Sequence, residues 1–142
     1  MEAYSFHAPF DPQIDITALE EGRRNHAREE ILEAAEAAAA LEARHFVIHP
    51  GPEEERSPAG NQRIRRLENA ARVLDQVAAR CRRLGIGFVL ENMLPHLVMY
   101  KLSGHLQMLH LNDNRGTGDD HLPPGQGRID WNRLLAKLAE TA

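Results

Sequence analysis

Short runs of consecutive apolar residues divide this chain and predict its strands. Residues 45–51 and 87–92 are apolar on successive positions, which is typical of strands that are buried on both faces of a parallel sheet. A third run spans residues 106–113, and a shorter apolar segment, residues 3–10, predicts a strand that ends at His7. We therefore expect about four strands.

Between these runs, apolar residues recur at steps of three and four, which predicts amphipathic helices. The first covers residues 19–44 and the second residues 62–84, with Gly85 as its C-terminal stop. Asp130 is expected to cap a last helix over residues 131–140. The expected inward positions are Ala27, Ile31, Ala34, Ala35, Ala38 and Leu41, then Ile64, Leu67, Ala71, Leu74, Ala78 and Cys81, and finally Trp131, Leu134, Leu135 and Leu138.

The alternation of strands and helices determines the expected fold class. It predicts an α/β protein of parallel βα units, with helices flanking a sheet of about four strands. Two architectures fit this order, a doubly wound open sheet and part of a (β/α)₈ barrel. Residues 1–142 are expected to form a single domain, because the sequence has no obvious linker.

Composition excludes several classes of protein. The chain has 142 residues and a formal net charge of −4, without a basic stripe, which argues against a dedicated nucleic-acid binder. No apolar run is long enough for a membrane span, and no secretory signal is visible, so we expect no membrane partner. The single cysteine, Cys81, suits a small core position and a reducing, cytoplasmic location.

Polar side chains stand where each predicted strand ends. These residues are His7, His49, Glu91 with Asn92, and His110, which Asn112 and Asp113 follow. Because the chemistry of parallel α/β proteins lies beyond the C-terminal ends of the strands, we expect a shared mouth there. Imidazole and carboxylate donors suit Zn²⁺, Mn²⁺, Co²⁺ or Fe²⁺, and burial of Glu91 would favour a general-base role. Each residue alone also fits a hydrogen-bonded structural role.

Four segments carry a resemblance to a known superfamily: SFHAPF, HFVIHPG, GFVLENM and LHLNDNRGTGDDHLPPGQGRIDW. They resemble the xylose isomerase-like TIM barrels, which include sugar (phosphate) isomerases and epimerases and the endonuclease IV-type apurinic/apyrimidinic endonucleases. The resemblance implies that Glu91 matches a strand-end glutamate, which binds metal in both branches and acts as acid and base in the isomerases. It also implies that His110 is a metal ligand in both branches.

The two branches imply different roles for the remaining candidates. In the endonuclease branch, His7 and His49 would be additional zinc ligands, and Asp119 and His121 would match an Asp-x-His metal pair. In sugar epimerases, the positions of Asp119 and His121 more often shape the substrate pocket. Gly125 and Gly127 would form the tight turn before the last helix.

The sequence also departs from the family pattern. A complete barrel has eight strands and about 250 residues. The sequence lacks counterparts of three parts of the family pattern. These are the first strand, an Asp-x-x-His strand end between Glu91 and His110, and a last strand with its glutamate. The resemblance therefore implies a partial, truncated TIM barrel. Because exposed parallel edges invite pairing, we expect the chain to self-associate.

Three functions remain open at this point. The leading one is a divalent-metal-dependent sugar (phosphate) isomerase or epimerase that works by proton abstraction and a metal-stabilised enediolate. The metal would be Mn, Co, Zn or Mg, and the incomplete active site predicts weak or no turnover by this chain alone. One alternative is a non-catalytic barrel remnant or self-assembling fragment. The other is a zinc-dependent phosphodiesterase of the apurinic/apyrimidinic endonuclease type.

Overall fold

Four parallel strands form one sheet in the computed structural model of the chain, which describes residues 3–49, 60–91, 108–115 and 120–139. The strands are β1 (Ser5–His7), β2 (His45–Ile48), β3 (Gly87–Glu91) and β4 (Met108–His110), in the spatial order β1-β2-β3-β4. A doubly wound sheet reverses its strand order, whereas a barrel keeps neighbours in chain order. The sheet therefore matches a segment of a TIM barrel, and the predicted fold class is confirmed.

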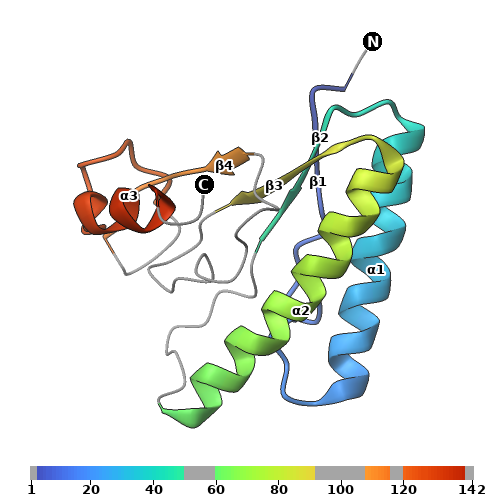
Figure 1. Cartoon of the computed structure of the whole chain (residues 1–142), viewed down its shortest axis with the longest axis horizontal. Coiled ribbons are helices and arrows are strands. Elements are labelled where there is room, and N and C mark those ends of the chain that lie inside the picture. Colours follow the sequence, from blue (N-terminus) through green and yellow to red (C-terminus); the bar gives the residue numbers. More distant parts are fainter. Residues whose placement is uncertain (1–2, 50–59, 92–107, 116–119, 140–142) are drawn as a thin grey trace.

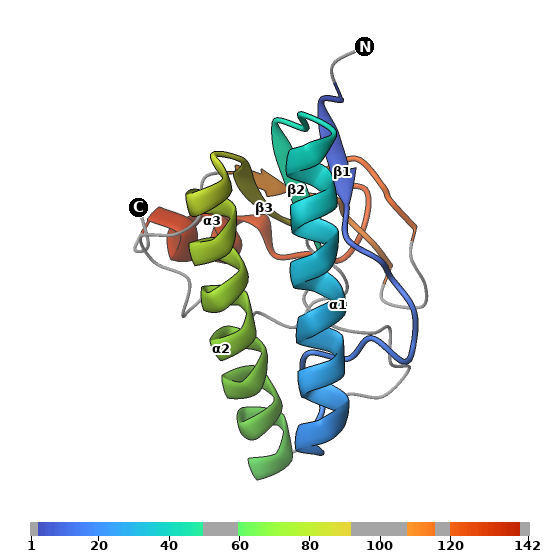
Figure 2. The same ribbon diagram turned by 90° about the vertical axis from the view of Figure 1, so that its right-hand side faces the viewer.

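Two long helices cover one face of this sheet. Helix α1 (Glu21–Ala40) and helix α2 (Asn61–Leu84) lie side by side along strands β1 to β3 (Figures 1 and 2). Alternate strand residues point at the helices, and the small residues of α1 allow close packing. The buried cluster contains Phe46, Ile48, Phe88 and Leu90 from the strands and Ala27, Ile31, Ala35, Ala38, Leu74, Val77 and Cys81 from the helices.

Helix α1 is shorter at both ends than its pattern predicts. Glu20 is the N-cap, and its carboxylate accepts hydrogen bonds from the backbone N–H groups of Gly22 and Arg23 at 2.7 and 2.6 Å. These hydrogen bonds lower the pKa of Glu20 below its ordinary value. Leu41 is the C-cap and is exposed, so its predicted inward position was wrong. The helical period no longer applies once the helix has ended.

Helix α2 begins one residue earlier than predicted and ends at Leu84, as expected. Gly85 follows in the left-handed conformation at φ 74°, which confirms the predicted stop. Ile64 is exposed, against the prediction, because the first turns of α2 extend past the strands (Figure 1). Cys81 is fully buried, and burial raises its pKa to about 11, which confirms its place in the core.

The strands end earlier than their apolar runs. Strand β2 ends at Ile48 and β4 at His110, whereas Asp113, among the described residues, pairs only through an isolated antiparallel bridge with Leu122. The Asp113 carboxylate accepts hydrogen bonds from the backbone N–H groups of Gly125 and Ile129. These bonds draw Asp113 toward that later segment and away from the strand pairing of the sheet. Residues 50–51, 92, 106–107 and 140 of the predicted elements lie outside the described residues.

The last helix, α3 (Trp131–Ala139), begins as predicted. The Asp130 carboxylate accepts a hydrogen bond from the backbone N–H of Arg133 at 3.0 Å, which confirms its capping role. Leu134 is buried but Leu135 is exposed, so the predicted apolar side is only partly covered. Within the described ranges, no helix has both the length and the apolar character needed to cross a membrane.

The segment between β1 and α1 is held against α2 by a buried polar network. Asp15 accepts hydrogen bonds from both the backbone and the hydroxyl of Thr17, at 2.9 and 2.6 Å, and pairs with Arg66 of α2 at 3.1 Å. Asn69 of α2 donates to the Ala18 carbonyl at 2.9 Å. Buried charges are costly unless paired in this way. The network fixes residues 15–18 of the segment that follows β1 against α2.

Candidate metal centre

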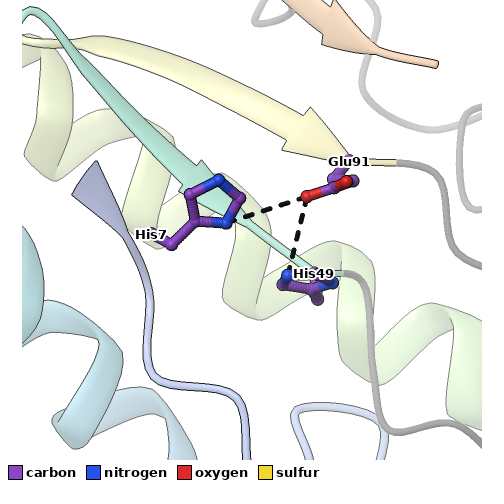
Figure 3. Close-up of side chains that lie close together, drawn as sticks. All are labelled: His7, His49 and Glu91. Carbon is purple, nitrogen blue, oxygen red and sulfur yellow. Dashed lines mark ion pairs between the residues drawn. The ribbon is translucent and has the colours of Figure 1, made fainter. Parts of the chain in front are cut away.

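Three of the predicted strand-end residues meet at the C-terminal edge of the sheet (Figure 3). His7 is the last residue of β1, His49 follows β2, and Glu91 is the last residue of β3. The register pairs Ile48 with Leu90, so His49 and Glu91 emerge level with each other from neighbouring strands. Parallel pairing therefore brings together residues that are far apart in the sequence.

The two imidazoles face the same oxygen of the Glu91 carboxylate. Oε2 of Glu91 lies 3.7 Å from Nδ1 of His7 and 3.6 Å from Nε2 of His49, and one ligand atom from each residue lies within 4.8 Å of the others. These distances exceed those of ordinary hydrogen bonds. Two donors bound to one tetrahedral Zn²⁺ ion at about 2.0–2.1 Å are about 3.4 Å apart. Both the spacing and the donor chemistry fit a divalent metal ion.

Burial of the three side chains falls from the sheet outward. The side chain of Glu91 is 2% exposed, that of His49 16% and that of His7 50%. A buried carboxylate is costly unless positive charge compensates it. The gradient places the Glu91 carboxylate at the buried end of the cluster and His7 at a rim that is open to solvent, which is the arrangement that an exchangeable ligand requires.

The second oxygen of Glu91 faces different groups. Asn112 donates a hydrogen bond from Nδ2 to Oε1 at 3.1 Å, and Nδ1 of His121 lies 3.9 Å from Oε1. His121 adopts the left-handed conformation at φ 46°, which only a few per cent of non-glycine residues do. Oε2 of Glu91 thus faces His7 and His49, whereas Oε1 faces Asn112 and His121.

Asn112 and Phe10 also belong to the site. The sequence places Asn112 just after a predicted strand end, but its pattern assigns neither residue a role in the site. The ring centroid of Phe10 lies 4.5 Å from that of His49, and Phe10 is half exposed. Phe10 ends the SFHAPF segment and Asn112 follows His110 by two residues, so both lay within the quoted motifs. Because an aromatic or amide side chain carries no metal-ligand signal of its own, only the structure shows these contacts.

The predicted site residues have different outcomes. His7, His49, Glu91 and His121 come together, with Glu91 at the centre. The backbone of His110 pairs in register with Glu91, but its side chain is outside the described part of the chain. Asp119 also lies outside the described residues. The roles of all six as catalytic, metal-binding or substrate-binding residues stay predictions.

Comparisons with known proteins bear on the fold. A family model described as xylose isomerase-like TIM barrel matches residues 1–103. The TTHB071 protein from Thermus thermophilus, in a structure described as soaking with ZnCl₂, is similar at 25% identity over 92% of this chain and 66% of its own, with a TM-score of 0.62. No curated protein matches the sequence.

Two further solved structures share the fold at lower identity. A D-tagatose 3-epimerase-like protein is 23% identical over 96% of this chain and 66% of its own, with a TM-score of 0.61. The IolI protein, described with a binding zinc atom, is 17% identical over 97% of this chain and 63% of its own, with a TM-score of 0.55. The chain thus spans slightly less than two thirds of the length of each of these three structures.

Proposed function

This chain belongs to the xylose isomerase-like TIM barrel family, and on that basis we propose that it is a divalent-metal-dependent protein of the sugar isomerase and epimerase type. One observation carries the proposal: the imidazoles of His7 and His49 face a single oxygen of the buried Glu91 carboxylate. This cluster stands at the C-terminal ends of parallel strands, where barrel enzymes place their chemistry.

The chain offers a defined set of donors for the metal. His7, His49 and Glu91 would hold it, and His110 and His121 are the further candidates. A bound Mn²⁺, Co²⁺, Zn²⁺ or Mg²⁺ ion would polarise the oxygens of a sugar. The imidazole-rich donor set favours Zn²⁺, Mn²⁺ or Co²⁺ over Mg²⁺, which prefers oxygen ligands.

Glu91 is the proposed acid and base. Its carboxylate would take the proton from the carbon next to a sugar carbonyl. Return of that proton to the neighbouring carbon, with a proton moving between the two sugar oxygens, would isomerise the sugar, whereas epimerisation would need a second group that delivers a proton to the opposite face of the same carbon. The hydrogen bond from Asn112 to Oε1 fixes the plane of the carboxylate, and burial excludes competing water. The substrate would be a small sugar or sugar phosphate that enters from the exposed side, past His7 and Phe10.

Solvent deuterium exchange tests this proposal even where turnover is weak. The purified chain is incubated in D₂O with ketoses or ketose phosphates and with each metal in turn, and NMR follows deuterium at the carbon next to the carbonyl. We expect metal-dependent exchange that the Glu91→Gln variant loses. The control is His26→Ala, which removes an exposed histidine of α1 and should exchange like the wild type. Exchange that persists in Glu91→Gln would remove Glu91 from the mechanism.

A zinc phosphodiesterase is the second candidate, and the clustering of His7 and His49 favours it. Two histidines beside a carboxylate suit zinc-assisted hydrolysis. The formal net charge of −4 counts against a nucleic-acid substrate. Cleavage of DNA at an abasic site, assayed with zinc, separates the two candidates, because the isomerase proposal expects none.

A non-catalytic, self-associating module is the third candidate. Within the described strands, β1 pairs only with β2 and β4 only with β3, so both outer edges could accept a second copy. Light scattering after size exclusion tests this, and a stable monomer would contradict self-association. Stoichiometric metal analysis completes the comparison, because a remnant should retain no ion tightly. The cytoplasmic location stays a prediction.

A further inference from the structure

Asp113 is a buried carboxylate that does not belong to the candidate metal centre. Its side chain is fully buried, and each of its oxygens accepts two hydrogen bonds. Oδ2 accepts from the backbone N–H of Gly125 and from Nε1 of Trp131, both at 2.8 Å. Oδ1 accepts from the backbone N–H groups of Asn114 and Ile129 at 2.9 and 3.1 Å. An ionised carboxylate has about four acceptor positions, so these donors saturate it.

These bonds tie the end of β4 to the segment that leads into α3. The backbones of Asp113 and Leu122 exchange two hydrogen bonds, at 2.7 and 2.8 Å, and the N–H of Arg128 donates to the Asn114 carbonyl at 2.8 Å. Gly127 packs so closely here that a Cβ atom would overlap the Asp113 carboxylate and the Asn114 backbone. The segment from residue 122 to Trp131 therefore wraps around one carboxylate.

This arrangement fixes two residues that lie beside Oε1 of Glu91. Asn112 directly precedes Asp113, and His121 directly precedes Leu122, the partner of Asp113 in the backbone bridge. Asn112 donates to Oε1, and His121 lies beside it. The bridge thus directs one side chain from each of the two paired segments toward the same carboxylate oxygen.

We propose that Asp113 is a positioning residue, which holds Asn112 and His121 against Glu91 and does not itself bind the ligand of the site. The inference rests on the proposed function only in taking Glu91 as the centre of the site. Asp113 suits this role because a carboxylate only accepts hydrogen bonds, and all four neighbours donate. In Asp113→Asn, the amide NH₂ would face two of these donors, and both bonds would be lost.

The first test uses the metal-free protein. NMR follows the side-chain amide of Asn112, whose hydrogen bond to Glu91 should give it a resonance distinct from those of free side-chain amides. We expect Asp113→Asn to abolish this distinct resonance, and Trp131→Phe, the milder change, to shift it in the same direction. The matched control is Asp130→Ala, which removes the cap of α3 without touching the Asp113 network and should leave the resonance in place. An unchanged Asn112 resonance in folded Trp131→Phe and Asp113→Asn overturns the proposal.

The second test measures zinc affinity in a double-mutant cycle. His121→Ala should weaken zinc binding by about tenfold in the wild-type background, the lower end of the range for residues that support a metal site. In the Asp113→Asn background, His121→Ala should cause no further loss, because His121 is already displaced, and in the milder Trp131→Phe background the further loss should be smaller than in the wild type. Additive losses would mean that Asp113 only stabilises the fold. If none of zinc, manganese, cobalt and magnesium binds the wild type, the proposed function fails, and the Asn112 resonance still decides the role of Asp113.

Discussion

Nε2 of His49 lies 3.6 Å from Oε2 of Glu91, and the two residues leave neighbouring parallel strands at the same level. The strand pairing itself creates this contact, since the register of β2 and β3 sets the separation of the side chains. Ile48 and Leu90, which directly precede His49 and Glu91, are buried in the hydrophobic core and so support the pair. A site built in this way exists before any ligand binds, which lowers the cost of binding.

Replacement of His49 by alanine should therefore weaken zinc binding strongly. Loss of residues that merely support a metal ligand costs about 10- to 100-fold in affinity, so loss of a direct ligand should cost about 100-fold or more. Competition with a chromophoric zinc chelator measures the change. His26→Ala, on the exposed side of α1, is the matched control and should bind zinc like the wild type. Equal affinities in His49→Ala and His26→Ala would show that this cluster is not the zinc site.

Glu91→Gln should separate stability from metal binding. Because Glu91 is a buried carboxylate, the neutral amide should leave the metal-free protein as stable or make it slightly more stable. Zinc at about 100 times its dissociation constant should stabilise the wild type by about 2.7 kcal/mol and should stabilise Glu91→Gln far less. Thermal unfolding with and without zinc measures both effects. A large loss of stability in metal-free Glu91→Gln would indicate a structural carboxylate instead.

The sequence predicted most of the fold because periodicity reports burial directly. The runs that contain Phe46 and Phe88 are strands, and Gly85 ends α2 as expected. The predictions of buried positions failed where a helix ends, as at Leu41, or extends beyond the sheet, as at Ile64. Period alone does not show where a helix loses contact with the sheet.

The candidate site was predictable only in part. Strand ends in a parallel sheet share one edge, so His7, His49 and Glu91 could be grouped from the sequence. The contact between Asn112 and Glu91 depends on how the chain turns after β4, which no local pattern encodes. Asp113 resembled a strand residue because its run is apolar, whereas its side chain accepts hydrogen bonds from Gly125 and Trp131, which come much later in the chain.

The single cysteine provides a probe of unfolding. Burial raises the pKa of Cys81 from 9.0 to about 11, which lowers the thiolate fraction at about pH 8 by about 100-fold relative to an exposed thiol. We expect Cys81 to react with a thiol reagent at least about 100-fold more slowly in the native protein than in denaturant. Absorbance of the released chromophore measures both rates. Equal rates would place Cys81 outside the stable core.

Gly127→Ala should destabilise the protein, because the added methyl group would meet the Asp113 carboxylate and the Asn114 backbone. Overpacking of this kind costs about 1–3 kcal/mol. Urea unfolding measures the loss. Gly125→Ala is the matched control from the same turn: its Cβ would meet open space, and only its φ of 87° opposes the change, at about 1–2 kcal/mol. A loss of less than about 1 kcal/mol in Gly127→Ala would contradict the close packing around Asp113.

Acid should weaken the attachment of residues 122–131, because it protonates the Asp113 carboxylate that they surround. Burial acts to raise the pKa of Asp113, but hydrogen bonds from Trp131, Ile129 and Gly125 outweigh it and hold that pKa well below its ordinary value of 3.8. A group whose pKa is lower in the folded state adds stability above its unfolded pKa and loses it as pH falls toward the folded value. The stability difference between the wild type and Asp113→Asn should therefore be constant above about pH 5 and shrink steadily below about pH 4. Urea unfolding at several pH values, followed by the fluorescence of the single tryptophan, Trp131, measures this difference. A difference that stays constant down to about pH 3 would mean that the Asp113 carboxylate has an ordinary pKa and is not held by these hydrogen bonds.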